Sequence, residues 1–88
     1  MLKVAYKNTP LRVLRRMQPQ VARQIRDKIM AVAADPSNPS LGVRPLKNRP
    51  GFRLRIGYWR VIFDTDAVTL EVLAIETRGD VYKPRKRR

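Results

Sequence analysis

The stretch FRLRIGYWRVIF, residues 52–63, constrains the fold of this chain more than any other. Apolar and basic residues alternate on both sides of Gly57-Tyr58, which is typical of two strands joined by a two-residue hairpin turn. In this register one face of the hairpin is apolar and the other carries arginines. The apolar face holds Phe52, Leu54, Ile56, Trp59, Val61 and Phe63, and the opposite face holds Arg53, Arg55 and Arg60.

The basic face of this hairpin is a candidate anion site. Arg55 lies directly opposite Arg60 in the predicted register, and like charges in that position destabilise a sheet unless an anion lies between them. A guanidinium stays charged and can bind two phosphate oxygens at once, so Arg53, Arg55 and Arg60 are suited to hold a phosphodiester. An ordinary solvated strand face is the alternative interpretation. Trp59 is expected in the core, although an indole can also stack on a base.

The net charge indicates which kind of partner the chain binds, and the missing residue types limit the chemistry it can perform. The 88 residues include 20 Lys and Arg against 7 Asp and Glu, which gives a formal charge of +13. Such a surface attracts polyanions, nucleic acid first, and a charged surface without a dedicated ligand is the alternative. The chain has no cysteine and no histidine, so thiolate metal sites, disulfides and the commonest general base are missing. With no signal peptide and no apolar run of about 18 residues, a cytoplasmic protein is expected.

Apolar periodicity divides the chain into one strand, two helices and three further strands. Alternation predicts the strands, and i, i+3 and i+4 spacing after proline start signals predicts the helices. The predicted elements are a strand at residues 2–6, helices at 10–17 and 19–34, the hairpin at 52–63 and a last strand at 68–75. This order predicts an α+β fold, an antiparallel sheet of about four strands with the N-terminal helix pair packed on one face. The arginines would then lie on the opposite face.

The remaining segments connect or end these elements. Residues 36–51 are rich in proline and are expected to form a loop. Asp64 and Asp66 lie in a turn, where such side chains usually accept hydrogen bonds from the local backbone, and a metal site there is disfavoured. The last strand is apolar at both parities in its second half, which predicts a central strand covered on both faces. Residues 1–82 are expected to form a single domain, followed by a flexible basic tail at 83–88.

Two titratable side chains add to the basic face. A phenol close to several arginines has its ionised form favoured, which makes Tyr82 a candidate proton acceptor. A tyrosine that covers the edge of the core is the alternative interpretation. Glu71 and Glu76 stand on the last strand, where one of them can pair with the arginine face, and Glu76 can also act as an acid or base.

The helix pair, the run LKNRPGFRLRIGYWRVIF and the later LEVLAIETRGDVYK together resemble the RelE/ParE superfamily of bacterial toxins. The resemblance covers almost the whole chain and is most specific over residues 46–83. It implies the RelE-like fold. In the RelE branch it further implies an mRNA interferase that enters the ribosomal A site and cleaves mRNA without a metal. The 2′-hydroxyl attacks the adjacent phosphate, which leaves a 2′,3′-cyclic phosphate and a 5′-hydroxyl.

The resemblance also implies roles for individual residues. Arg53 and Arg55 match the family's basic pair, Arg60 its phosphate-stabilising arginine, and Tyr82 the C-terminal tyrosine implicated in proton transfer. Arg78 matches an arginine shortly before that tyrosine. The predicted catalytic residues are therefore Arg60, Tyr82, Arg53, Arg55 and Arg78, and the predicted RNA or ribosome contacts are Lys47, Arg49, Lys83, Arg85 and Lys86.

The chain departs from the family pattern in three places. Arginines replace the lysines of the basic pair, Glu76 stands where a further catalytic arginine is expected, and the turn at Gly57-Tyr58 is tight for the family.

The resemblance implies a cognate antitoxin, which charge complementarity predicts to be acidic, together with mRNA in the ribosomal A site and rRNA. No cofactor, metal, membrane or sequence-specific DNA is expected as a partner of this chain. The alternatives are a ParE-like poison of DNA gyrase without nuclease activity and a basic RNA- or ribosome-binding protein without activity.

Overall fold

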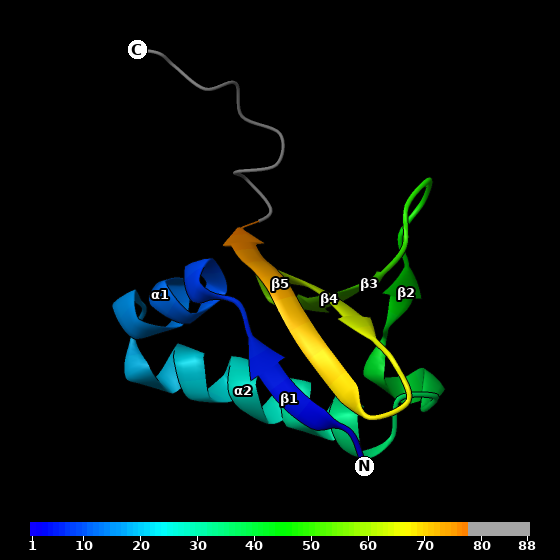
Figure 1. Ribbon diagram of the computed structural model, residues 1–88. Helices are drawn as coiled ribbons and strands as arrows, with labels where there is room; N and C mark the ends of the chain where they lie inside the picture. Colours follow the sequence, from blue (N-terminus) through cyan, green and yellow to red (C-terminus); the bar gives the residue numbers. More distant parts are fainter. Residues whose placement is uncertain (78–88) are drawn as a thin grey trace.

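A sheet with two helices on one face forms the part of the protein that the computed structural model describes, residues 1–77 (Figure 1). Within these residues the sheet has five strands in the order β1-β5-β4-β3-β2. The predicted α+β class and the helix pair on one face are confirmed. The elements are β1 (Lys3–Tyr6), α1 (Asn8–Arg16), α2 (Pro19–Ala34), the 3₁₀ turn η1 (Pro39–Leu41), β2 (Arg44–Pro45), β3 (Phe52–Ile56), β4 (Trp59–Thr65) and β5 (Thr69–Thr77).

The longer helix, α2, has the bounds that the sequence predicts. Pro19 occupies its first turn, where the missing N–H costs no hydrogen bond and the fixed φ favours a helix. Its buried side chains recur at helical spacing and face the sheet, and they are Ala22, Ile25, Ile29, Val32 and Ala33. The shorter α1 begins two residues before the predicted start, at Asn8, and buries Pro10 and Leu14.

The hairpin forms in the predicted register. Ile56 pairs with Trp59, so Gly57 and Tyr58 are the whole turn, and Gly57 has the positive φ of 57° that such turns require. Leu54 and Val61 are fully buried on the helix side. Trp59 packs against the core on this side, as expected. The arginines therefore lie on the sheet face that points away from the helices, which we call the outer face.

A β-bulge explains why the last strand is apolar at both parities. Phe63 pairs with Val72 but its neighbour Ile62 pairs with Ala74, so Leu73 is an extra residue on β5. The bulge moves the buried positions from even to odd numbers, and Leu70, Val72 and Ile75 all lie in the core. β5 is an internal strand, as predicted. The prediction that it is covered on both faces is wrong, because helices cover only one face (Figure 1). The neighbouring apolar residues Val72 and Leu73 result from the bulge.

Two predictions about the sheet are wrong. The segment predicted to be a loop contains β2, which pairs with β3 at the sheet edge, where a proline that cannot donate is tolerated. The sheet is also mixed rather than antiparallel, because β1 runs parallel to β5. The two helices carry the chain back along one face, and that crossover sets the direction of β1 relative to β5.

The core between the sheet and the helices is continuous. Phe63 is 2% exposed, and its ring stacks on that of Phe52 at a centroid distance of 5.5 Å. Tyr6 also faces this side, and burial raises its pKa while the nearby charge of Arg26 partly offsets the rise. No helix in residues 1–77 is long and apolar enough to span a membrane.

Candidate functional site

The outer face carries a row of three charged side chains across three strands. In the sheet register Arg55 on β3 lies opposite Arg60 on β4, and Arg60 lies opposite Glu76 on β5. The predicted like-charged pair is therefore present. In the described part of the chain no ion pair joins Arg60 to Glu76, although the two are direct neighbours. Two arginines directly opposite each other on neighbouring strands repel, and an anion between them would relieve that repulsion.

Arg60 is the most enclosed member of this row. It is only half exposed, and within residues 1–77 its buried Nε has no hydrogen-bond partner. A buried donor without a partner loses its hydration and gains nothing in return, so it favours an incoming acceptor. A phosphate oxygen would supply that acceptor.

The loop before β3 borders the site. Arg49 lines a hollow of about 400 Å³ together with Glu76, and the floor of the hollow is Ile62 and Ala74 on the outer face. Lys47 is exposed on the same loop. The predicted contact residues Lys47 and Arg49 thus lie on the segment next to the arginine row, and Arg49 reaches the same hollow as Glu76.

Arg53 belongs to a second hollow on the outer face, which sequence reasoning missed. It has a volume of about 230 Å³ and is lined by Gly42, Arg44, Arg53 and Arg55. Arg44 pairs directly with Arg53 across β2 and β3. The sequence predicted a loop at Arg44, so it gave no reason to place this side chain beside the site.

The remaining predicted site residues, Arg78, Tyr82, Lys83, Arg85 and Lys86, lie outside the described residues. The tyrosines within residues 1–77 do not lie on the arginine row. Tyr6 faces the helices, and Tyr58 lies in the hairpin turn, where it is 83% exposed. The candidate proton acceptor Tyr82 therefore stays a prediction.

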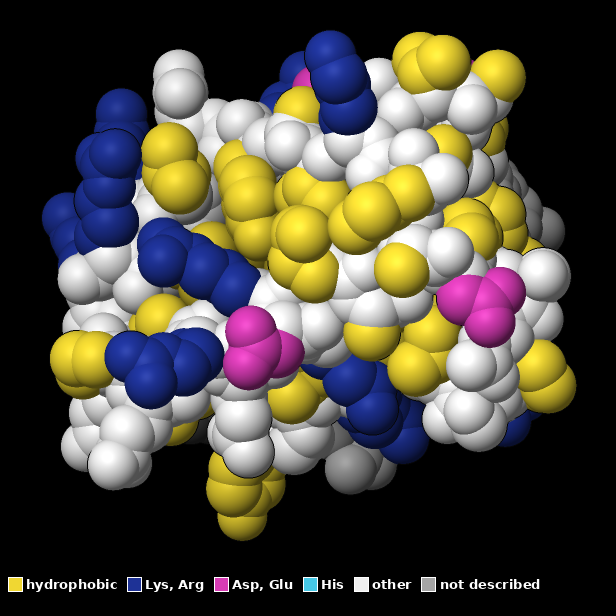
Figure 2. Space-filling view, turned by 90° about the horizontal axis from the view of Figure 1, so that it is seen from below, with side chains coloured by type: hydrophobic (Ala, Val, Ile, Leu, Met, Phe, Trp, Pro, Cys, Tyr) yellow, Lys and Arg dark blue, Asp and Glu magenta, His cyan; other side chains and the backbone are white. Residues whose placement is uncertain are grey.

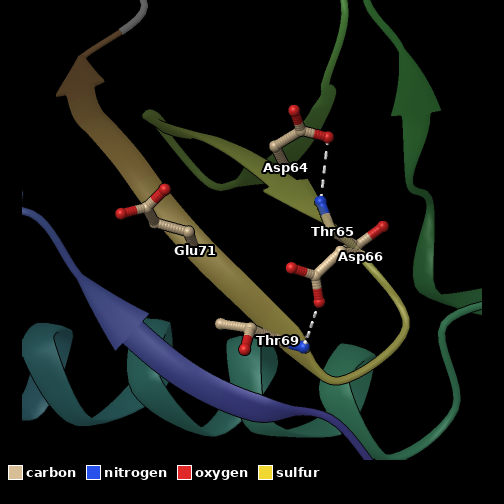
Figure 3. A pocket seen from close by; sticks show the side chains of 5 residues that line it. All are labelled: Asp64, Thr65, Asp66, Thr69 and Glu71. Carbon is tan, nitrogen blue, oxygen red and sulfur yellow. Dashed lines mark hydrogen bonds between the residues drawn. The ribbon is translucent and has the colours of Figure 1, made fainter.

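Three carboxylates gather at the far end of β4 and β5 from the arginine row (Figure 3). Asp64 accepts a hydrogen bond from the Thr65 N–H at 2.9 Å, and Asp66 accepts two from the turn that follows it. Glu71 lies 3.8 Å from Lys7 Nζ. The expected role of Asp64 and Asp66 in satisfying the local backbone is confirmed, but Asp64 lies in β4 and not in the predicted turn, because the strand continues to Thr65. Within residues 1–77, no group of His, Cys, Asp and Glu is arranged to hold a metal.

The turn at Asp66 gives a testable pH dependence. The N–H groups of Val68 and Thr69 donate to Asp66 Oδ1 at 2.8 Å and lower its pKa below the ordinary 3.8. A lowered folded pKa stabilises the fold above the ordinary value, and this contribution is lost as the pH falls through the folded value. Asp66→Ala should therefore destabilise the protein at neutral pH and lose that effect in acid, measured by urea unfolding. Equal destabilisation at both pH values would contradict this, and Asp27→Ala is the charge-matched control.

The helix side of the molecule is different in character. Figure 2 views the molecule from below Figure 1, where α2 lies lowest, and shows apolar side chains gathered over the middle of this side, with Lys and Arg side chains around them. Between α2 and the hairpin turn lies an apolar groove of about 280 Å³. Its lining residues are Val21, Gln24, Ile56, Gly57, Tyr58 and Trp59.

The chain matches no protein-family model and no curated protein sequence. Its fold matches that of toxins in solved toxin–antitoxin complexes. The RelE toxin of RelBE2 from Mycobacterium tuberculosis aligns with a TM-score of 0.74 and 20% identity over 88% of this chain and 98% of that one. The RelB–RelE complex from Methanococcus jannaschii aligns with a TM-score of 0.72 and 18% identity, over 91% of this chain and 99% of that one. YafQ from Escherichia coli aligns with a TM-score of 0.60 and 12% identity, over 94% of this chain and 100% of that one. The predicted RelE/ParE fold is confirmed.

Proposed function

We propose that this protein, which has the RelE fold, is the toxin of a toxin–antitoxin pair and cleaves mRNA on the ribosome. The observation that carries the proposal is the like-charged pair Arg55–Arg60 on the outer face, in which the buried Arg60 Nε has no hydrogen-bond partner among residues 1–77. Such a pair is mutually repulsive, and an anion between its members relieves the repulsion. A scissile phosphodiester is the anion that fits the net charge of +13 and the fold.

The proposed reaction uses groups of this chain alone. Arg60 and Arg55 bind the non-bridging oxygens and stabilise the charge that builds up on them in the transition state. The 2′-hydroxyl of the preceding ribose attacks the phosphorus, and its proton passes to Tyr82. The bond from phosphorus to the 5′-oxygen then breaks, and this oxygen takes up a proton from solvent water. The products are a 2′,3′-cyclic phosphate and a 5′-hydroxyl.

A cleavage assay on programmed ribosomes tests the function. Purified protein is added to ribosomes that hold a defined mRNA, and the new 5′ and 3′ ends are analysed chemically. We expect cuts at the A-site codon with 2′,3′-cyclic phosphate ends, and none with the double variant Arg60→Ala, Tyr82→Phe.

Two outcomes would contradict the proposal. If induction of the protein stops growth while mRNA stays intact and DNA breaks accumulate at gyrase sites, the ParE-like function is correct. If the wild type binds ribosomes, cleaves nothing and is as harmless as the double variant, the protein is a binding module.

We also propose an acidic antitoxin as the protein partner. The solved relatives from Mycobacterium tuberculosis and Methanococcus jannaschii are complexes with antitoxins. In this chain the groove beside Trp59 is apolar, and exposed Arg23 and Arg26 line a second hollow on another side of α2, next to α1. An amphipathic segment with acidic flanks would complement both features. Co-expression with the protein encoded next to this chain tests the pairing, and failure of an acidic neighbour to form a complex would contradict it.

A further inference from the structure

A second like-charged pair lies on the outer face, one strand further toward the sheet edge. Arg44 on β2 is directly opposite Arg53 on β3, as Arg55 is opposite Arg60. A single like-charged pair can be an accident of composition. Two pairs on one face, each unfavourable without an anion, indicate that this face binds more than one negative charge.

The surroundings of this second pair suit a phosphate. The hollow between Arg44, Arg53 and Arg55 is completed by Gly42, and no carboxylate of residues 1–77 lines it. Gly42 has no side chain, and a Cβ at that position would meet no atom within 4 Å, so an anion can approach from this side. Arg53 is half-buried while Arg44 is exposed at the edge, which gives one fixed and one adaptable guanidinium.

The two pairs are offset by two residues along β3 and by one strand across the sheet. Two residues advance about 6.8 Å and one strand adds about 4.8 Å, so the midpoints of the pairs lie on the order of 8 Å apart. This distance is comparable to the separation of successive phosphates along an extended single strand, and arginine side chains are long enough to absorb the difference.

We propose that Arg44 and Arg53 form a second phosphate subsite, which binds the phosphodiester next to the scissile one in the same RNA strand. This inference rests on the proposed function, which identifies the phosphate bound by Arg55 and Arg60 as the scissile one. The strand then runs diagonally from β4 across β3 to the edge at β2. The carboxylates of Asp64, Asp66 and Glu71 at the other end of β4 and β5 repel a polyanion, so the path leads away from them (Figure 3).

Short oligonucleotides with 2′-O-methyl groups test the subsite, because they carry the phosphates but cannot be cleaved. Affinities for a dinucleotide with one phosphate and a trinucleotide with two are measured by NMR titration at fixed salt. Arg44→Ala should weaken trinucleotide binding by about fivefold to tenfold and leave dinucleotide binding unchanged. Arg60→Ala should weaken both. The control is Arg12→Ala, which removes the same charge from an exposed position on α1.

The outcomes separate this inference from the proposed function. If Arg44→Ala and Arg44→Gln bind the trinucleotide no more weakly than Arg12→Ala does, the subsite is wrong, even if programmed ribosomes show mRNA cleavage. If the trinucleotide result holds while the mRNA on ribosomes stays intact, the subsite stands and the proposed function is wrong.

Discussion

Replacing Arg60 by alanine is expected to slow mRNA cleavage on programmed ribosomes by about 10²–10³-fold, the usual cost of removing one preorganised transition-state donor. Arg60 is held on an internal strand of the sheet, and its Nε is buried with no partner in the described residues. The side chain therefore needs little reorganisation when charge develops on the phosphate. Single-turnover rates at saturating protein measure the effect without a contribution from weaker ribosome binding.

Two variants make this result specific to the geometry of Arg60. Arg16→Ala removes an equal charge from an exposed position on α1 and should cleave at close to the wild-type rate. Arg60→Lys keeps the charge but loses the planar fork, so its rate should fall between those of alanine and wild type. Equal losses for Arg16→Ala and Arg60→Ala would mean that total charge alone matters. Thermal unfolding of each variant checks that the fold is retained.

The largest loss of stability is expected from Phe63→Ala, at about 3–5 kcal/mol of unfolding free energy. Phe63 is 2% exposed and stacks on Phe52, and it adjoins the β-bulge where β4 and β5 change register. Removal of the ring leaves a cavity that the paired strands cannot collapse to fill. A small domain has roughly 5–15 kcal/mol in total, so this variant should be close to unfolding. Urea denaturation followed by circular dichroism gives the value.

Tyr58→Ala is the matched control for Phe63→Ala. It also truncates an aromatic side chain of the hairpin, but Tyr58 is 83% exposed in the turn. Its loss should change the free energy of unfolding by less than about 0.5 kcal/mol. If Phe63→Ala is no more costly than Tyr58→Ala, then the packing between the sheet and the helices is not what holds this sheet together.

The features predicted correctly from the sequence are those set by neighbouring residues. The register of the hairpin follows from the alternation around Gly57, and α2 follows from a proline start and regular apolar spacing. The direction of β1 and the existence of β2 depend on residues far away in the chain, and strands of four and two residues carry no such information. The bulge at Leu73 was visible only as an apolar doublet, which buried strands also show.

The site was predictable to the same extent. Arg53, Arg55 and Arg60 could be placed on one face because a strand alternates every second residue. Arg44 could not, because its place beside Arg53 depends on an edge strand of two residues. Glu76 could be expected near the arginine face, but the sequence did not show which arginine it would adjoin, because that depends on how β4 and β5 are aligned past the bulge.

The parallel pairing of β1 with β5 has a consequence for how this protein is made. It joins a strand at the start of the chain to the last described strand, so almost every residue between them lies within the loop that it closes. Such long-range closure is slow and raises the contact order. During translation β1 stays without its partner until β5 has left the exit tunnel, and β5 also brings Glu76 beside Arg60. The five-strand sheet is therefore completed only after β5 has been synthesised.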